Sequence, residues 1–219
     1  MGIFDAMPHP YPGHLITFCG LDGCGKTTLL TWLKGYLEER GMEVFLTKQP
    51  TPYVRESAIF RTYMDQPDHS AYDYRSLSLL AASDRIQHCS RVIVPALEKG
   101  SVVISDRYFY SCLANLRARG YTQDRWIYEV AGFIPKPDLA IFIDVDVEEA
   151  VCRVRAREEE KDRYIDMELQ YRLREEYLDI AGAAGGMVLS SAQPLQEEKA
   201  ALCRLVDEVL KDDAHRHDA

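Results

Sequence analysis

The segment Gly20-Leu21-Asp22-Gly23-Cys24-Gly25-Lys26-Thr27-Thr28 constrains the fold of this chain more than any other part of its sequence. It matches the pattern G-x-x-x-x-G-K-[ST] and directly follows an apolar run at residues 15–19. Such glycines let backbone N–H groups surround a phosphate, and the N-terminal end of the next helix adds positive potential. Lys26 is predicted to reach the β- and γ-phosphates of a nucleotide, and Thr27 to bind Mg²⁺. The segment therefore predicts a strand, a phosphate-binding loop and a helix, in that order.

Short apolar runs alternate with longer helical patterns along the whole chain. The runs predicted as strands are residues 15–19, 44–47, 102–105, 139–144 and 187–190. The patterns predicted as helices are residues 26–40, 53–64, 72–98, 109–119, 123–131, 147–159, 166–181 and 195–210. Strands that are apolar throughout are typical of a parallel sheet with helices on both faces. The sequence thus predicts an α/β fold with an open five-stranded parallel sheet.

The ends of the chain differ from the part between them. Residues 1–14 are rich in proline and are predicted to form a flexible leader, and residues 212–219 a short tail. Between them, no linker or repeat divides residues 15–211, so we expect a single domain there. No apolar run is long enough to cross a bilayer, and the 6 cysteines include no C-x-x-C pair. We therefore expect a cytoplasmic protein without a membrane partner.

The charge balance argues against a nucleic-acid partner. The chain has 26 Lys and Arg residues against 35 Asp and Glu residues, which gives a net charge of −9. Proteins that bind nucleic acid obtain much of their affinity by neutralising many backbone phosphates, and they usually carry the opposite bias. Any phosphate bound here must instead meet a few well-placed cations and backbone N–H groups.

Three further motifs stand at predicted element ends: Asp106-Arg107-Tyr108, Lys136-Pro137-Asp138-Leu139 and Arg153-Val154-Arg155-Ala156-Arg157. With the phosphate loop and in this order, they make residues 15–210 resemble the thymidylate kinases. The resemblance implies a P-loop NTPase fold with a helical lid at about residues 153–163. It also implies a homodimer through the helix at 72–98, and transfer of the γ-phosphoryl group of ATP, with Mg²⁺, to a nucleoside monophosphate.

The resemblance also implies roles for particular side chains. Arg107 would bind the acceptor phosphate, and Asp106 would orient Arg107 and contact Mg²⁺. Asp22 would face the acceptor sugar. Because no arginine stands in the loop, the lid would supply the catalytic one. The residues expected to be catalytic are Lys26, Asp106, Arg107, Arg157 and Arg163. Those expected to bind ATP are Gly20, Asp22, Gly23, Cys24, Gly25, Lys26, Thr27, Thr28, Arg153 and Ala192. Those expected to bind the acceptor are Asp22, Pro50, Ala81, Arg85, Arg107, Ser111 and Asn115. The expected metal ligands are Thr27 and Asp106.

These residues also have structural interpretations. Asp106 and Arg107 are compatible with an ion pair at a strand end, and Asp22 with a turn cap. A helix rich in Arg and Glu is usually a solvated face with i,i+4 pairs.

The acceptor-base pocket is where the sequence departs from the family pattern. Thymidylate kinases have Leu-Leu-Phe-Ala-Ala-Asp-Arg where this chain has Leu79-Leu80-Ala81-Ala82-Ser83-Asp84-Arg85, so the arginine is kept and the stacking ring is lost. Farther along, the family's Ala-Tyr-Gln is Ala114-Asn115-Leu116. These changes predict an acceptor base that differs from thymine or is bound differently. Alternatively, Tyr72, Tyr74 or Tyr110 supplies the missing ring.

The sequence therefore predicts an ATP- and Mg²⁺-dependent kinase that acts on dTMP or on a related or modified pyrimidine nucleotide. One alternative is a nucleotide-binding regulatory protein whose acceptor pocket has decayed. Another is a kinase that acts on a modified base within DNA. Retention of Arg85, Asp106 and Arg107 disfavours the first alternative, because a switch needs no acceptor site. The acidic composition disfavours the second.

Overall fold

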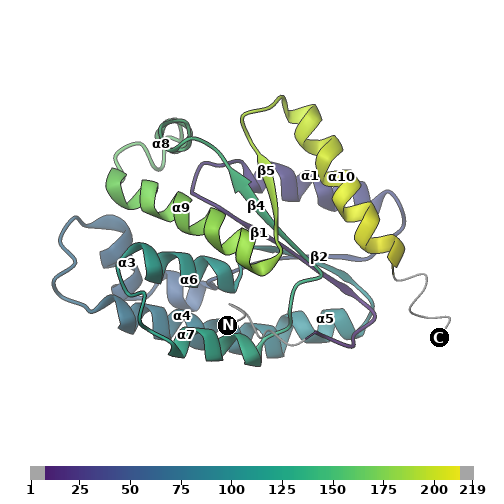
Figure 1. The fold of residues 1–219 in the computed structure, drawn as a ribbon, viewed down its shortest axis with the longest axis horizontal. Coiled ribbons are helices and arrows are strands. Elements are labelled where there is room, and N and C mark those ends of the chain that lie inside the picture. Colours follow the sequence, from purple (N-terminus) through teal and green to yellow (C-terminus); the bar gives the residue numbers. More distant parts are fainter. Residues whose placement is uncertain (1–7, 213–219) are drawn as a thin grey trace.

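A computed structural model describes residues 8–212 of the chain (Figure 1). Five strands form one parallel sheet in the order β2-β3-β1-β4-β5. Their bounds are His14–Cys19 (β1), Val44–Lys48 (β2), Val102–Asp106 (β3), Leu139–Asp144 (β4) and Met187–Ser190 (β5). In the middle of the sheet, Ile16 of β1 pairs with Ile104 of β3 on one side and with Leu139 of β4 on the other. The predicted open parallel sheet is confirmed.

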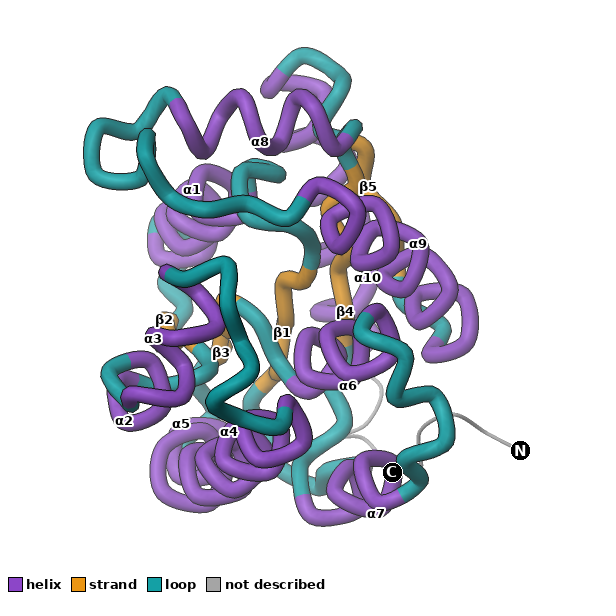
Figure 2. The backbone as a smooth tube through the Cα atoms, turned by 90° about the vertical axis from the view of Figure 1, so that its left-hand side faces the viewer, coloured by secondary structure: helices purple, strands orange, loops and turns teal. Residues whose placement is uncertain are grey.

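Helices cover both faces of this sheet, as the apolar central strands require. One face is covered by α1 (Lys26–Glu38) and α10 (Leu195–Asp212). The other layer contains α4 (Tyr74–His88), α5 (Val94–Glu98), α6 (Phe109–Ala118) and α9 (Met167–Ala184). The shorter helices are α2 (Pro52–Arg55), α3 (Ala58–Asp65), α7 (Trp126–Val130) and α8 (Val147–Arg155). Figure 2 looks at the carboxyl edge of the sheet, with α8 above it, α4 below it and α3 at the left beside β2.

Three predicted helices outside the lid are divided or begin later than predicted. Residues 53–64 contain two helices, because Ser57 caps α3 by accepting a hydrogen bond from the Phe60 N–H at 3.3 Å. The helix predicted at 72–98 starts at Tyr74 and passes through a π-helical turn, Cys89–Ile93, into α5. Pro95 lies just beyond that turn and has no N–H to donate, which explains the local change of helix type. The helix predicted at 123–131 begins only at Trp126 and ends in a 3₁₀ turn, Ala131–Phe133.

The lid is helical only at its start. The helix predicted at 147–159 ends at Arg155, and residues 156–166 form turns and loop. Asp166 then caps α9, its side chain accepting a hydrogen bond from the Leu169 N–H at 3.0 Å. Two helices therefore fix the ends of a loop that runs over the phosphate-binding loop.

Part of the predicted leader is packed against the domain. The Gly13 N–H donates to the Leu97 carbonyl at 2.9 Å, and His14 already belongs to β1. His9 Nε2 lies 2.9 Å from Asp138 Oδ2, which also accepts from the Leu15 N–H at 2.8 Å. Residues 8–14 are thus part of the fold, whereas residues 1–7 of the leader and 213–219 of the tail lie outside the described residues. Within residues 8–212, no helix combines the length and the apolar character needed to cross a bilayer.

Candidate active site

The phosphate-binding loop joins β1 to α1 at the carboxyl edge of the sheet. Its glycines Gly20, Gly23 and Gly25 have φ angles of 138°, 83° and 98°. A Cβ atom on Gly20 would lie 2.5 Å from the Ile143 carbonyl oxygen, and one on Gly23 would lie 2.1 Å from the Ala150 carbonyl oxygen. Glycine is therefore needed for backbone conformation at all three positions and for space at the first two.

Lys26 is the buried cation of this loop. Its side chain donates to the carbonyl oxygens of Gly20 at 3.2 Å and Leu21 at 2.6 Å, and the residue is only 6% exposed. Cys24 packs beneath it, with Sγ 3.4 Å from Lys26 Nζ. The next residue, Thr27, lines the open side of the loop. A fixed positive charge, backbone N–H groups and a helix N-terminus thus meet at one point, which is the arrangement that binds phosphate.

Arg107 occupies an unusual backbone conformation between β3 and α6. Its φ angle is 69°, in the left-handed region that non-glycine residues seldom adopt. The Arg107 N–H donates to the Phe18 carbonyl at 2.8 Å, and the Arg107 carbonyl accepts from Ser105 Oγ at 2.7 Å. The guanidinium group donates to the Gly20 carbonyl at 3.1 Å and to the Tyr177 hydroxyl at 3.0 Å. The strained turn therefore directs Arg107 toward the phosphate loop.

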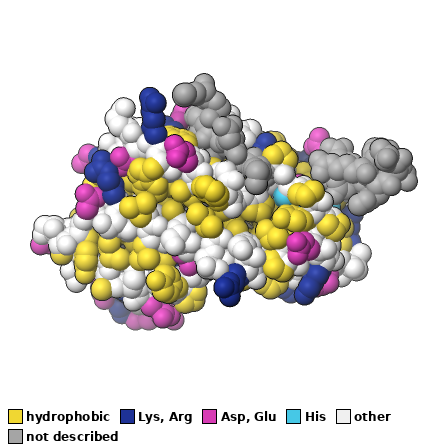
Figure 3. Space-filling view, turned by 90° about the horizontal axis from the view of Figure 1, so that it is seen from below, with side chains coloured by type: hydrophobic (Ala, Val, Ile, Leu, Met, Phe, Trp, Pro, Cys, Tyr) yellow, Lys and Arg dark blue, Asp and Glu magenta, His cyan; other side chains and the backbone are white. Residues whose placement is uncertain are grey.

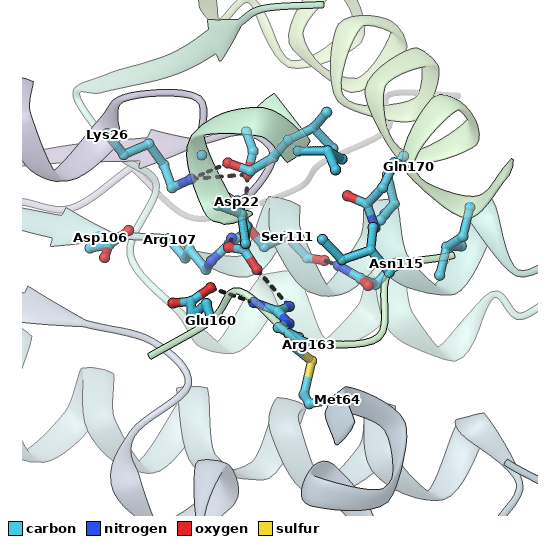
Figure 4. Close-up of a pocket in the computed structure, with 18 of the residues that line it drawn as sticks. Asp22, Lys26, Met64, Asp106, Arg107, Ser111, Asn115, Glu160, Arg163 and Gln170 are labelled. Carbon is cyan, nitrogen blue, oxygen red and sulfur yellow. Dashed lines mark hydrogen bonds and ion pairs between the residues drawn. The ribbon is translucent and has the colours of Figure 1, made fainter. Parts of the chain in front are cut away.

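The carboxylate of Asp22 lies between two guanidinium groups (Figure 4). Arg107 Nη2 donates to Oδ1, and Arg163 Nη2 donates to Oδ2 at 2.9 Å. Burial alone would raise the pKa of Asp22, but the charges of Arg107, Lys26 and Arg163 hold that pKa well below its usual range. Asp22 is therefore ionised at neutral pH, and it links the lid to the phosphate loop.

The lid arginines fall into two groups. Glu160 accepts from Arg157 Nη1 at 3.3 Å and from Arg163 Nη1 at 3.1 Å, next to Asp22. Arg163 Nε is buried and has no hydrogen-bond partner within residues 8–212. Arg153 points elsewhere and donates to Ser191 Oγ at 2.8 Å and to the Ser191 carbonyl at 3.1 Å, in the loop after β5. Arg163 thus has a free donor near the phosphate loop, whereas Arg153 contacts the loop that precedes α10.

Asp106 offers an oxygen atom that fits a divalent cation. Its Oδ2 atom pairs with Lys48 Nζ at 2.9 Å, while Oδ1 is buried and has no partner in the described part of the chain. Asp106 lines the same cavity as Thr27. Mg²⁺ prefers such oxygen ligands and usually keeps several waters beside one or two protein groups and substrate phosphates. The carboxylate of Asp106 and the hydroxyl of Thr27 are thus a suitable donor set for Mg²⁺.

The acceptor end of the site is formed by α4 and α6. Arg85 of α4 is 2% exposed and donates to the carbonyls of Tyr108 at 3.3 Å and Ala81 at 2.9 Å. On α6, Asn115 Nδ2 donates to the Ser111 carbonyl at 2.9 Å. Ser111 Oγ in turn accepts from the hydroxyl of Tyr177 at 3.1 Å. Tyr177 therefore joins Ser111 to Arg107, a connection that the sequence analysis did not predict.

Of the three tyrosines considered as substitutes for the lost ring, Tyr74 lines the cavity and is 8% exposed. Tyr72 does not line the cavity, and Tyr110 packs in the core against Phe142 with their ring centroids 5.4 Å apart. A ring that the sequence analysis missed, Tyr63 of α3, meets Tyr74 edge to face at 5.0 Å. Tyr63 lies at this end of the cavity because residues 53–64 form two separate helices, α2 and α3. The hydrophobic periodicity of the sequence did not show this division.

A single cavity of about 1200 Å³ connects the loop, the lid and the acceptor end. Predicted site residues that line it are Gly20, Asp22, Gly23, Gly25, Lys26, Thr27, Thr28, Pro50, Ala81, Arg85, Asp106, Arg107, Ser111, Asn115, Arg153, Arg157 and Arg163. Cys24 and Ala192 do not line it. Cys24 is buried beneath the loop, and the neighbours of Ala192, Ser191 and Gln193, line the cavity instead.

The parallel sheet, its phosphate loop and a cavity lined by several arginines define a P-loop phosphotransferase. The profile of the family described as "Thymidylate kinase" matches residues 18–201. A "Probable thymidylate kinase" of Pyrococcus abyssi is 39% identical over 191 residues, covering 85% of this chain and 91% of that protein. A "Thymidylate kinase" of Geobacillus sp. is 34% identical over 195 residues, covering 84% and 91%.

The chain therefore belongs to the thymidylate kinase family of ATP-dependent phosphotransferases. This confirms the resemblance that the sequence motifs indicated. It does not favour the alternative of a regulatory protein with a decayed acceptor pocket.

Proposed function

We propose that this protein transfers the γ-phosphoryl group of ATP to dTMP, forming ADP and dTDP. The observation that carries the proposal is a single cavity in which the phosphate loop faces Arg107, Arg85 and the acceptor end. A site for one nucleotide alone would need neither Arg107 beside the phosphate loop nor a separate acceptor end that contains Arg85. The relatives named thymidylate kinase support thymine as the acceptor base.

In the proposed reaction, a phosphate oxygen of dTMP attacks the γ-phosphorus of ATP, and the bond to the β–γ bridging oxygen breaks. The transition state spreads negative charge over the transferring group, so positioning and charge neutralisation do most of the work. Lys26 and the loop N–H groups neutralise the donor phosphates, and Arg107 binds the acceptor phosphate. Arg163, with Arg157 beside it, stabilises the transferring group. Phosphate oxygens replace the Asp22 carboxylate as partners of Arg107 and Arg163.

The remaining site residues have supporting roles in the proposal. Arg153 and the loop that contains Ala192 border the adenine of ATP, with Arg153 bonded to Ser191. Thr27 and Asp106 hold Mg²⁺, which neutralises charge on the β- and γ-phosphates when it is bound. Pro50, Ala81 and Asn115 border the acceptor nucleoside. We also propose a cytoplasmic enzyme whose partner is a free nucleotide and not nucleic acid.

A coupled ADP-release assay across dTMP, dUMP, UMP, CMP, dCMP and 5-substituted deoxyuridylates tests this proposal. We expect dTMP to give the highest kcat/KM. Preference for a larger 5-substituted base would instead support the altered pocket that Ala81 and Asn115 suggest. ADP release that no monophosphate stimulates would overturn the proposal.

Asp106→Asn is expected to raise the Mg²⁺ concentration for half-maximal activity by about tenfold or more, and to lower kcat as well. The amide keeps the size of the side chain but removes the charge of the oxygen that has no protein partner. A Mg²⁺ titration at saturating ATP and dTMP measures the change. Asp65→Asn is the matched control, because Asp65 lines the same cavity but pairs with Arg61 at 2.6 Å. An unchanged Mg²⁺ dependence in Asp106→Asn would contradict the metal assignment.

The homodimer is a further part of the proposal. Leu79 on α4 is 54% exposed, and hydrophobic atoms spread over much of the face on which α4 lies (Figure 3). Exposed apolar surface of this kind often marks an interface.

We expect the wild type to have twice the 25.0 kDa chain mass by light scattering after gel filtration. Leu79→Glu should shift it toward the monomer, whereas Leu178→Glu, a change at an exposed leucine on α9, should not. A wild type that elutes as a monomer at all concentrations would refute the dimer.

A further inference from the structure

One face of α6 runs along the acceptor half of the cavity. Ser111, Asn115 and Arg119 follow one another at intervals of four residues, so they lie on the same side of the helix, and all three line the cavity. Arg119 stands directly after the last residue of α6. Eight residues of helix span about 12 Å. Because Ser111 is bonded through Tyr177 to Arg107, Arg119 lies at the far end from the acceptor phosphate.

Arg119 is a cation without an acidic partner. Its Nη1 atom donates to the Asn115 carbonyl at 3.2 Å and to Asn115 Oδ1 at 2.8 Å. No carboxylate of the described chain forms an ion pair with it, and its Nε and Nη2 atoms make no hydrogen bond there. By contrast, Arg117 on the same helix pairs with Glu176 and Asp179, each at 2.6 Å. Arg119 therefore has unused donors at the wall of the cavity.

Aromatic rings fix the position of this guanidinium group. Arg119 Cζ lies 4.1 Å from the ring centroid of Tyr74 and 5.8 Å from that of Tyr63. Burial raises the pKa of Tyr74 to about 12, so the ring beneath Arg119 is neutral at physiological pH. The cation–π contacts and the two bonds to Asn115 together hold the group in one orientation. Its free donors are thus part of a prepared site.

We propose that Arg119 is a specificity-determining residue that donates hydrogen bonds to the C4 keto oxygen of the acceptor base, the one farther from the sugar and phosphate. This inference rests on the proposed function. The α4 wall carries Arg85 and the α6 wall carries Arg119, which gives two guanidinium groups at the acceptor end. Thymine and uracil have two keto oxygens, whereas cytosine has one keto oxygen and one amino group. Because a guanidinium group only donates, cytosine leaves one of the two arginines facing another donor. The pair therefore selects keto pyrimidines.

The test compares wild type and Arg119→Met with dTMP and with dCMP as acceptors. We expect Arg119→Met to lower kcat/KM for dTMP by about ten- to a hundredfold, mainly through KM, with the KM for ATP unchanged. The ratio of kcat/KM for dTMP to kcat/KM for dCMP should also be lower in Arg119→Met than in the wild type. Arg119→Lys, which keeps a donor and its charge, should recover part of the loss. Arg125→Met is the control, because Arg125 is exposed and does not line the cavity. Thermal unfolding of each variant reports whether the fold is intact.

An unchanged KM for dTMP in Arg119→Met would overturn the inference. An equal loss with dTMP and dCMP would also overturn it, because a purely structural role affects both acceptors alike. These outcomes are distinct from failure of the proposed function. If the proposed function were wrong, the wild type itself would phosphorylate neither dTMP nor dUMP.

Discussion

Lys26→Ala is expected to lower kcat by about 10²- to 10³-fold, the magnitude found when one group that stabilises developing charge is removed. Lys26 is buried in the phosphate loop, and within residues 8–212 the oxygen atoms that its side chain contacts are the loop carbonyls of Gly20 and Leu21. Its charge is therefore available to the donor phosphates, and no neighbouring cation on α1 can replace it. The measurement is kcat from ADP release at saturating ATP and dTMP.

Lys34→Ala provides the comparison on the same helix. Lys34 is on the surface of α1 and pairs with Glu38 at 2.5 Å, so its loss should leave kcat unchanged. Both variants should unfold at temperatures close to that of the wild type, because neither change opens a cavity in the core. If Lys26→Ala kept more than about half of the wild-type kcat, the assignment of this loop to the donor phosphates would be wrong.

Arg163→Met is expected to lower kcat by about 10³-fold or more, in the range observed when a catalytic arginine is lost from a phosphoryl-transfer site. Arg163 contacts Asp22 at 2.9 Å and has a buried Nε atom without a partner within residues 8–212. The phosphate loop itself contains no arginine. We therefore expect this variant to be more impaired than Arg157→Met, since the ion pair of Arg157 among the described residues is with Glu160 and not with the phosphate loop.

Arg155→Met is the matched control within the lid, because Arg155 is exposed and does not line the cavity. Single-turnover measurements separate the chemical step from product release, so they show whether the loss in Arg163→Met lies in the transfer itself. A loss in Arg155→Met as large as that in Arg163→Met would indicate that the lid acts through its overall charge. Arg163 would then have no special role.

The sheet was predictable because its signal is local. Each strand is a short apolar run between turn residues, and burial on both faces makes such runs stand out. Helix boundaries were less predictable, because single side chains decide them. The cap at Ser57 divides the helix predicted at 53–64, and the chain leaves the helical conformation at Arg155 although the following residues favour a helix.

The phosphate loop was predictable because all of its chemistry lies in nine consecutive residues. The rest of the site depends on contacts between distant segments. Asp22 and Arg163 are 141 positions apart, and Arg107 and Tyr177 are 70 apart. The left-handed conformation of Arg107 has no sequence signal, since arginine seldom adopts it. Arg119 follows Asn115 at helical spacing, but only the fold shows that both face the cavity.

The proposed phosphoryl transfer is tested most directly by incubating the protein with MgATP and dTMP and quantifying both products by chromatography. The proposed transfer predicts one dTDP for each ADP, with little ADP formed when dTMP is left out. ADP formed at the same rate with and without dTMP, and no dTDP, would contradict it.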